Sequence, residues 1–326
     1  MTPRNPTQHR QTDRRGLHFI RALRTLANAA NQPANAAEST PRNDPLVRAF
    51  LEKELSGAIN TGSALTNTQG DPIAQEFGQY LFEQTLPGQI MAAGGIPIDF
   101  NTRLDGITAS GAAWIQEGRG FPVTKGSVSS ETLHDYKIGA ITVVSNDLLR
   151  QASTGSDLAI RNALITDSVR QIDSKFASDD ATQTNTAPGG ILENVTATGL
   201  PLEQMIQAHI ANNNNPLTSV LVLSYNDTWL TDSEIQNLAI MGIWPVYSQY
   251  ATKRFIIDAA KVAVGFRGGV IDTTQTGTIE MQSQPSQDSV TPVSTDTISL
   301  FQDNATAYRV VTYIDWAVMD NGVTSV

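Results

Sequence analysis

The chain of 326 residues is 40% hydrophobic and 17% charged, as is usual for a globular protein, and it is long enough for one large domain or two modest ones. It has no cysteine and only four widely spaced histidines, so a disulfide framework and a cysteine nucleophile are excluded, and a zinc site such as H-x-x-x-H is poorly supported. The net charge of −10 argues against a nucleic-acid-binding body, and no stretch reaches the about 18 apolar residues of a membrane span.

The N-terminal 50 residues differ in charge from the rest of the chain. They carry eight arginines against three acidic residues, a net charge of +5, while the remainder is strongly acidic. Within them, "GLHFIRALRTLANAA" predicts an amphipathic helix with Arg21 and Arg24 opposite an apolar face. That face comprises Phe19, Ile20, Leu23, Leu26, Ala27 and Ala30. The segment is interpreted either as a flexible tail with a transient helix or as an arm that docks on a partner, and an Arg-rich transit peptide is a third reading.

Two helices with clearer start signals follow this arm. The first has Asp44 as N-cap and Pro45 in its first turn, and it ends before Gly57. The second repeats the Asp-Pro start at residues 71–72 and is expected to stop at residues 87–88. A small, polar linker separates them, so the folded body is expected to begin near residue 70.

The stretch "GRGFPVTKGS" (118–127) superficially resembles a phosphate-binding loop. Its lysine precedes the last glycine, however, and the following residues alternate and are β-branched, so no helix is available to hold a phosphate. With strand-like segments on both sides, it predicts the tip of a long two-stranded hairpin. Such a hairpin is marginal alone, so we expect it to lie on a neighbouring copy. The candidate contact residues are Trp114, Arg119, Phe121, Pro122 and Lys125.

A long helix is predicted after the hairpin, from a cap at Ser156 or Asp157 to about Ser178. Its apolar residues recur every seven positions and form one stripe: Leu158, Ile165, Ile172, Val169 and Phe176. This stripe is equally compatible with an ordinary core helix.

The C-terminal half mixes helices and strands irregularly, which predicts an α+β protein. A helix near residue 205 should turn Leu202, Met205, Ile206 and Ile210 inward, with His209 as a structural residue. "SVLVLSYND" predicts a buried strand ended by Asn226 and Asp227 and followed by a short helix. The closing strand alternates between an apolar face and a more polar one. The apolar positions are Tyr308, Val310, Thr312, Ile314, Trp316 and Val318.

This order of elements resembles the tailed-phage major capsid proteins of the Hong Kong 97-like fold. The resemblance runs from about residue 99 to the end of the sequence, and its specificity lies in order and spacing because each stretch is short. The stretches are "AAWIQEG" (112–118), "YKIGAITVVSNDLLRQAS" (136–153), "IDSKFA" (172–177), "APGGIL" (187–192), "MGIWPV" (241–246) and "LFQDNATAYRVVTYIDW" (300–316). The arm helix also looks like the N-terminal arms of some family members.

The resemblance implies how the chain is divided. The parts are an N-terminal arm (1–70), an entry into the peripheral (P) domain (71–98), an E-loop hairpin (99–137), the P domain (138–198) with a spine helix (156–178), the axial (A) domain (199–297) and closing strands of the P domain that return toward the A domain (298–326). Some family members cross-link an E-loop lysine to an asparagine on a neighbour's closing strand. Lys125 lies near the hairpin tip, but Ala307 and Tyr308 stand where the acceptor is expected, so the cross-link is not carried over.

The resemblance also implies the function. The chain would be a structural major capsid protein that self-assembles as hexamers and pentamers into an icosahedral shell around double-stranded DNA. It would be no enzyme, would need no cofactor or metal, and would not bind DNA sequence-specifically or contact a membrane. The implied partners are other copies, scaffolding and portal proteins, with decoration proteins as further candidates. Its place would be the virion, after assembly in the host bacterial cytoplasm.

Two alternatives remain open at this point. An encapsulin-type nanocompartment shell shares the fold but encloses a cargo enzyme, and the basic arm and the lack of any cargo signal favour the phage protein. An enzyme with an unrecognised carboxylate site is the other alternative. The carboxylate pairs Asp179–Asp180 and Asp232/Glu234 stand in loop-like contexts, however, and are better interpreted as solvated surface.

Overall fold

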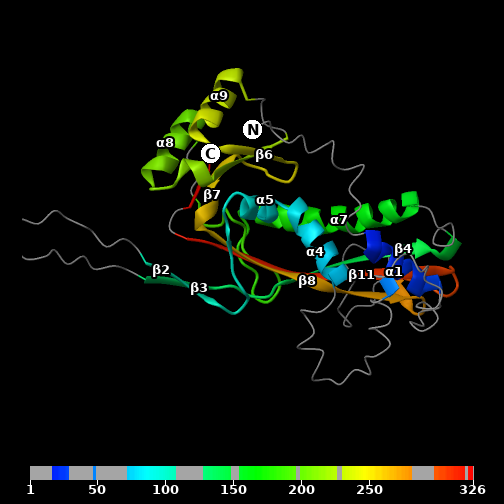
Figure 1. Cartoon of the computed structure of the whole chain (residues 1–326). Helices are drawn as coiled ribbons and strands as arrows, with labels where there is room; N and C mark the ends of the chain where they lie inside the picture. The colour runs from blue at the N-terminus through cyan, green and yellow to red at the C-terminus, as the bar shows by residue number, and fades with distance from the viewer. Residues whose placement is uncertain are drawn as a thin grey trace, which may run out of the picture. The chain divides into compact units, whose positions relative to one another are not determined.

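A computed structural model describes residues 17–28, 47–48, 72–107, 128–147, 154–195, 199–225, 230–280, 297–319 and 322–325 (Figure 1). The chain forms two compact units that alternate along the sequence. Unit 1 contains Met1–Leu81, Gly139–Ser168 and Gly268–Thr312, and unit 2 contains Phe82–Ile138, Val169–Arg267 and Tyr313–Val326. Helices and strands are interleaved, which confirms the α+β class predicted from the sequence.

The predicted arm helix exists as α1 (Leu17–Asn28), and Ile20 is buried as expected. Leu17, which the predicted apolar face did not include, is buried too. Arg24 was placed wrongly on the solvent face, because its side chain is only 8% exposed. The reason is the helical period, since a residue four positions after Ile20 lies on the same face as Ile20. Of the next predicted helix only Val47 and Arg48 are described, and both are helical.

The helix predicted from residue 71 begins at Pro72 but is divided in two, α4 (Pro72–Gln84) and α5 (Leu86–Ala92). The expected stop at Pro87 was therefore wrong. Pro87 lies in the first turn of α5, where a missing N–H costs nothing, and the Thr85 side chain caps the helix by accepting a hydrogen bond from Gly88 N.

The long helix is α7 (Thr154–Phe176), shifted by two residues from the predicted span. Ile165, Ile172 and Phe176 of its stripe are buried, whereas Leu158 and Val169 are only partly buried. The helix is thus confirmed, and its apolar stripe is narrower than predicted.

Four strands form the first sheet, in the order β1-β8-β11-β4. They are β1 (Ile96–Pro97), β4 (Lys137–Ser145), β8 (Val262–Thr274) and β11 (Ala305–Val318). On the closing strand β11 the predicted apolar positions from Tyr308 to Trp316 are buried, and Val318 is partly buried. On the alternate, more polar face Arg309 is exposed and Tyr313 is partly buried, whereas Asp315 is buried.

The second sheet lies within unit 2 and has the order β12-β7-β5-β6. Its strands are β5 (Ser219–Ser224), β6 (Trp244–Ser248), β7 (Phe255–Asp258) and β12 (Val323–Ser325). Strand β5 is buried along its whole length, as its continuous apolar run predicted. The short 3₁₀ helices η2 (Pro216–Thr218) and η3 (Ala259–Lys261) precede β5 and β8.

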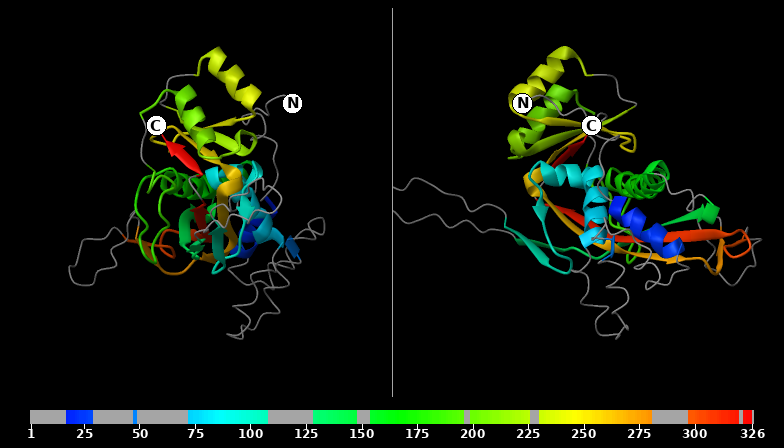
Figure 2. Two further views of the ribbon diagram at one scale, coloured as in Figure 1. Left: turned by 90° about the vertical axis from the view of Figure 1, so that its left-hand side faces the viewer. Right: turned by 45° about the vertical axis from the view of Figure 1, so that its right-hand side comes forward.

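Helices α8 (Leu202–Ala211) and α9 (Asp232–Met241) lie along one face of this second sheet (Figures 1 and 2). Their joint core with the sheet comprises Leu202, Met205, Ile206, Leu221, Leu223, Leu230, Leu238, Ile243 and Ile256. Ile210 was predicted to point inward with this set, but it is exposed. Asp232 and Glu234, expected in a loop, lie in the first turn of α9, where Glu234 closes a capping box with Thr231.

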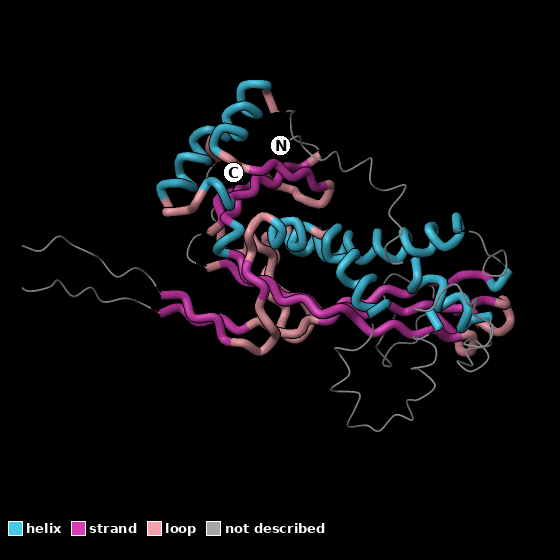
Figure 3. Tube along the Cα trace, in the orientation of Figure 1, coloured by secondary structure: helices cyan, strands magenta, loops and turns pink. Residues whose placement is uncertain are grey.

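Two smaller ribbons complete the described structure. Strands β2 (Arg103–Ile107) and β3 (Val128–Thr132) pair antiparallel, with Arg103 opposite Thr132 and Ile107 opposite Val128 (Figure 3). This pair confirms the base of the predicted hairpin. In unit 1, β9 (Thr278–Glu280) pairs with β10 (Thr297–Ser299) beside a small core around Leu300.

Candidate assembly surfaces

The contact residues predicted at the hairpin tip lie outside the described residues. They fall within the segment 108–127 that joins β2 to β3: Trp114, Arg119, Phe121, Pro122 and Lys125. Their role in contacts between copies stays a prediction. What the structure does describe is the base from which this segment leaves the body.

The base of the hairpin is attached firmly to unit 2. Leu133, just after β3, is buried, and its carbonyl oxygen accepts a hydrogen bond of 2.8 Å from Asn101 N. The next amide, His134 N, donates to Asp315 Oδ2 at 2.6 Å, which ties the hairpin to strand β11. Hydrogen bonds at two successive residues therefore fix this end of the hairpin to unit 2.

The residues before β2 are fixed in a second way. The Phe100 ring lies under the Arg267 guanidinium, with 5.2 Å from Arg267 Cζ to the ring centroid. The ring is also packed on Gly265, where any added Cβ would come within 2.9 Å of Phe100 Cε1. A side chain at residue 265 would therefore displace Phe100 and loosen the entry to the hairpin.

Large exposed hydrophobic side chains concentrate in unit 2. Ten are exposed in the part of the chain that the structure describes, and eight of these fall between residues 210 and 247. The eight are Ile210, Leu217, Tyr225, Ile235, Ile240, Met241, Trp244 and Tyr247. Single exposed apolar residues are ordinary, but a group of this size on one small body indicates an interaction surface.

Neighbouring members of this group contact one another. The Tyr225 and Tyr247 rings stack with their centroids 6.3 Å apart and their planes at 16°. At the opposite end of β5, Leu217 lies beside Gly242, the left-handed C-cap of α9, where an added Cβ would come within 2.8 Å of Leu217 Cδ2. Tyr225 and Leu217 thus lie beside the two ends of β6, whereas Ile210 lies apart from them on α8.

His209 has the structural role that the sequence predicted. It is fully buried on α8, where its Nδ1 lies 3.0 Å from Thr324 Oγ1 and its Nε2 lies 3.0 Å from Ser219 Oγ. Burial lowers the pKa of His209 to about 4, because the interior disfavours the charged imidazolium. The ring is therefore neutral at physiological pH and joins α8 to β5 and β12.

Two buried charged residues on α7 were missed by the sequence analysis. Arg161 is fully buried in unit 1, with its Cζ 4.9 Å from the centre of the Tyr80 ring. Asp173 is buried in unit 2, where its Oδ1 accepts a hydrogen bond of 2.7 Å from Leu86 N at the start of α5. Burial raises the pKa of Asp173 to about 7, although this hydrogen bond opposes the shift. Asp173 is next to Ile172 and three residues before Phe176, both in the buried stripe of α7. This spacing was the signal in the sequence that Asp173 is buried.

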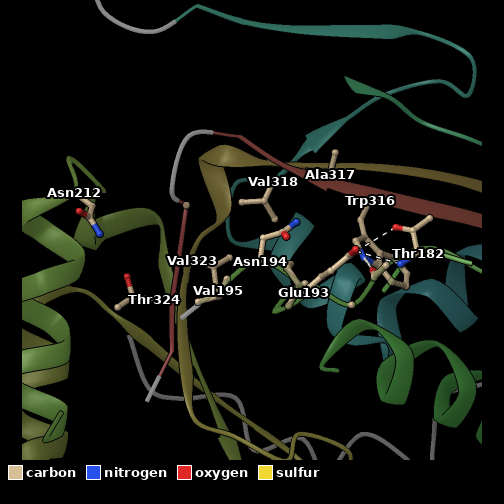
Figure 4. A pocket seen from close by; sticks show the side chains of 14 residues that line it. Thr182, Glu193, Asn194, Val195, Asn212, Trp316, Ala317, Val318, Val323 and Thr324 are labelled. Carbon is tan, nitrogen blue, oxygen red and sulfur yellow. Dashed lines mark hydrogen bonds between the residues drawn. The ribbon is translucent and has the colours of Figure 1, made fainter. Parts of the chain in front are cut away.

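A cavity of about 540 Å³ with a polar lining lies in unit 2 (Figure 4). Several polar groups that line this cavity are already hydrogen-bonded to one another. Trp316 Nε1 donates to Gly189 O at 2.8 Å, and the Thr182 amide and hydroxyl both donate to Glu193 Oε2 at 3.2 Å. The described side chains contain no cluster of His, Asp or Glu that could hold a metal ion. No described helix has the length and apolar character needed to cross a membrane.

No protein-family model matches the sequence. A curated relative, the capsid polyprotein of Pseudomonas phage PAJU2, is 26% identical over 350 residues, covering 93% of this chain and 52% of the relative. The chain therefore spans about half the length of the curated relative that it matches.

Among solved structures, one from Mycobacterium phage Bobi is similar at a TM-score of 0.51 and 14% identity, covering 72% of this chain and 88% of that chain. A structure of the satellite phage P4 procapsid with the size determination (Sid) protein has a TM-score of 0.47 at 11% identity, covering 87% of this chain and 98% of that chain. The fold and the curated relative agree with the resemblance found in the sequence: the chain has the Hong Kong 97-like fold and is similar to a phage capsid polyprotein.

Proposed function

We propose that the chain is the structural major capsid protein of a tailed bacteriophage, and that copies assemble as hexamers and pentamers into an icosahedral shell around double-stranded DNA. The observation that carries this proposal is the similarity to a phage capsid polyprotein along 93% of the chain. The exposed apolar group in unit 2 supports it, because a subunit made for assembly must keep apolar surface for its neighbours. A structural, non-enzymatic role fits the same relative.

The proposed partners follow from this role. They are other copies of the chain, scaffolding and portal proteins, and decoration proteins as further candidates. The protein would be part of the virion after assembly in the host cytoplasm. Its net charge of −10 suits a shell that encloses DNA without binding it tightly, because each phosphate contact would add affinity and hinder packing.

The proposed parts of the subunit keep the boundaries that the resemblance implies. Residues 1–70 are the arm, 99–137 the E-loop hairpin, 138–198 the P domain with its long helix, and 199–297 the A domain. Under this division the second sheet and its two helices supply most of the A domain. The arm is expected to contact the shell interior or neighbouring subunits.

The hairpin tip is proposed to dock on an adjacent copy through Phe121. Burying such a ring is worth roughly 1.5–3 kcal/mol, and the contact is repeated over the whole shell. Phe121→Ala should leave the subunit folded but weaken or abolish assembly, and Lys125→Ala is the control with little expected effect. Circular dichroism reports folding, and light scattering reports assembly. Unfolding of the isolated Phe121→Ala subunit, or a shell of unchanged thermal stability, would count against this role.

An encapsulin-type shell is the alternative function, and the phage relative does not favour it. Light scattering of the purified protein under assembly conditions tests the main proposal, which expects particles far larger than a 35.1 kDa monomer. A stable monomer, or measurable turnover of ATP, would contradict it. Phage terminase and portal genes beside the coding sequence would separate the phage reading from a nanocompartment with a neighbouring cargo-enzyme gene.

A further inference from the structure

We propose that two different flanks of the second sheet join neighbouring copies of this chain head to tail. One is the α9/β6 flank, defined by Ile235, Ile240, Met241, Trp244 and Tyr247. The other is the α8 flank, defined by Gln204, Gln207, Ile210 and Ala211. The inference rests on the proposed self-assembly and specifies which surfaces meet.

Helix α9 is poorly covered by its own chain. Among the α9 side chains that are described, only Leu238 is buried, while Ile240 is 82% exposed and Ile235 and Met241 are exposed too. Helices in proteins owe most of their stability to packing of an apolar face, and a helix of ten residues is marginal alone. The outer apolar side chains of α9 therefore lack the cover that a partner would give them.

Strand β6 is an edge strand of the second sheet. Trp244 is 59% exposed, and Tyr247 is exposed on the opposite face of the strand. Pro245 between them has no N–H to donate, so a partner strand cannot form a regular ladder along this edge. The contact must be made by side chains, and large aromatic residues are the ones that contribute most at such interfaces.

The α8 flank and the α9/β6 flank belong to opposite edges of the second sheet. Helix α8 contacts β12 and β7, whereas α9 contacts β6, and β12 and β6 are opposite edges of the sheet. The outer face of α8 exposes Ile210 beside Gln207 and Ala211, with Glu203 two turns earlier in the first turn of the helix. The same body thus carries one apolar flank on its β6 side and one weakly polar flank with an apolar centre on its α8 side.

Charge selects another copy of this chain as the occupant. The sequence has no lysine or arginine from residue 176 to residue 252, so neither flank can neutralise the phosphates of a nucleic acid. The acidic residues of the two helices, Glu203, Asp232 and Glu234, belong to first turns, whereas Ile210 and Ile240 belong to last turns. The last turns around Ile210 and Ile240 expose no charged side chain, so they can pack without burying an unpaired charge, and each copy of the chain supplies both.

Pairing of two unlike flanks is a heterologous contact, the type that closes a ring when the rotation between copies allows it. An isologous contact, in which α9/β6 flanks meet each other, would give dimers only. Head-to-tail pairing therefore suits the hexamers and pentamers of the proposed function. It also predicts that a variant altered on one flank can assemble with a variant altered on the other flank.

The experiment uses full-length Ile240→Glu and Ile210→Lys variants, each examined alone and mixed in equal amounts by sedimentation velocity. Each variant alone should raise the protein concentration needed for oligomers by roughly tenfold or more, since it buries an unpaired charge at the contact. The mixture should recover oligomers, because the carboxylate introduced at position 240 of one variant then meets the ammonium group introduced at position 210 of the other. Gln171→Glu, on the exposed side of α7, adds the same charge elsewhere and should assemble like the wild type.

The outcomes distinguish the two levels of the proposal. Wild-type protein that stays monomeric would contradict the proposed function itself. Wild-type assembly with equally good assembly of Ile240→Glu would overturn only the flank assignment. Rescue of Ile240→Glu by Ile240→Lys, without rescue by Ile210→Lys, would also overturn it, since it would show an isologous contact.

Discussion

Helices α8 and α9 are each ten residues long and pack on the same face of the same sheet, yet they are buried to very different degrees. Helix α8 buries Leu202, Met205, Ile206 and His209, whereas Leu238 is the one described α9 side chain that is buried. The first helix is part of the subunit's own core. The second leaves most of its apolar side chains for something outside the subunit. In the proposed role of a capsid subunit, the chain has to satisfy both demands, folding alone and still associating with its neighbours.

The largest expected effect is on α8. Met205 is fully buried in the core between α8 and the sheet, so Met205→Ala should lower the free energy of unfolding by about 2–5 kcal/mol. Ile240→Ala on α9 removes a similar amount of apolar side chain from an exposed site and should change it by no more than about 0.5 kcal/mol. Urea denaturation of the isolated subunits measures both. Equal losses would remove the distinction between the helices.

An intermediate effect is expected from pH, through His209 on α8. Its pKa is about 4 in the folded protein and near 6.5 when unfolded, so the unfolded chain takes up the proton first as pH falls. This difference in proton binding does not affect stability above pH 6.5. Between pH 6.5 and 4 it should lower the free energy of unfolding by about 1–3 kcal/mol.

The control for this effect is His209→Gln, which keeps hydrogen-bonding groups near Ser219 and Thr324 but does not titrate. The difference between the two proteins, measured by urea denaturation at pH 7.5 and 4.5, isolates the histidine from other titrating groups. If both lost the same stability on acidification, the imidazole would not be held neutral by burial.

The smallest effect is expected at the start of α9. The Thr231 side chain accepts a hydrogen bond from Glu234 N and the Glu234 carboxylate accepts one from Thr231 N. Thr231→Ala removes half of this capping box and should cost about 1 kcal/mol. Because α9 is weakly packed, the loss should show as faster hydrogen exchange in α9 while α8 stays protected. Uniform acceleration across both helices would indicate that α9 unfolds only with the whole core.

Sequence patterns were sufficient where burial follows from an unbroken apolar run. The residues 219–224 predicted a fully buried strand, and the stripe through Ile165, Ile172 and Phe176 predicted the long helix to within two residues of each end. The start of the helix at Pro72 was equally readable, because proline in a first turn is a local signal.

Patterns failed where the environment comes from distant parts of the chain. Ile210 has the spacing of a core residue, but it is exposed in the last turn of α8, where His209 is the residue that faces the core. Arg161 and Asp173 are buried because Tyr80 and the start of α5 provide partners that no local pattern encodes. The exposed aromatic residues of β6 could not be separated from core residues, since apolar character in the sequence does not distinguish a core from an interface.

Electron microscopy of the negatively stained, purified protein under assembly conditions tests the proposal of a shell-forming subunit most directly. Closed, roughly spherical particles, or isolated rings of six and five subunits, are the expected result. A field of separate monomers at every protein and salt concentration tried would contradict it.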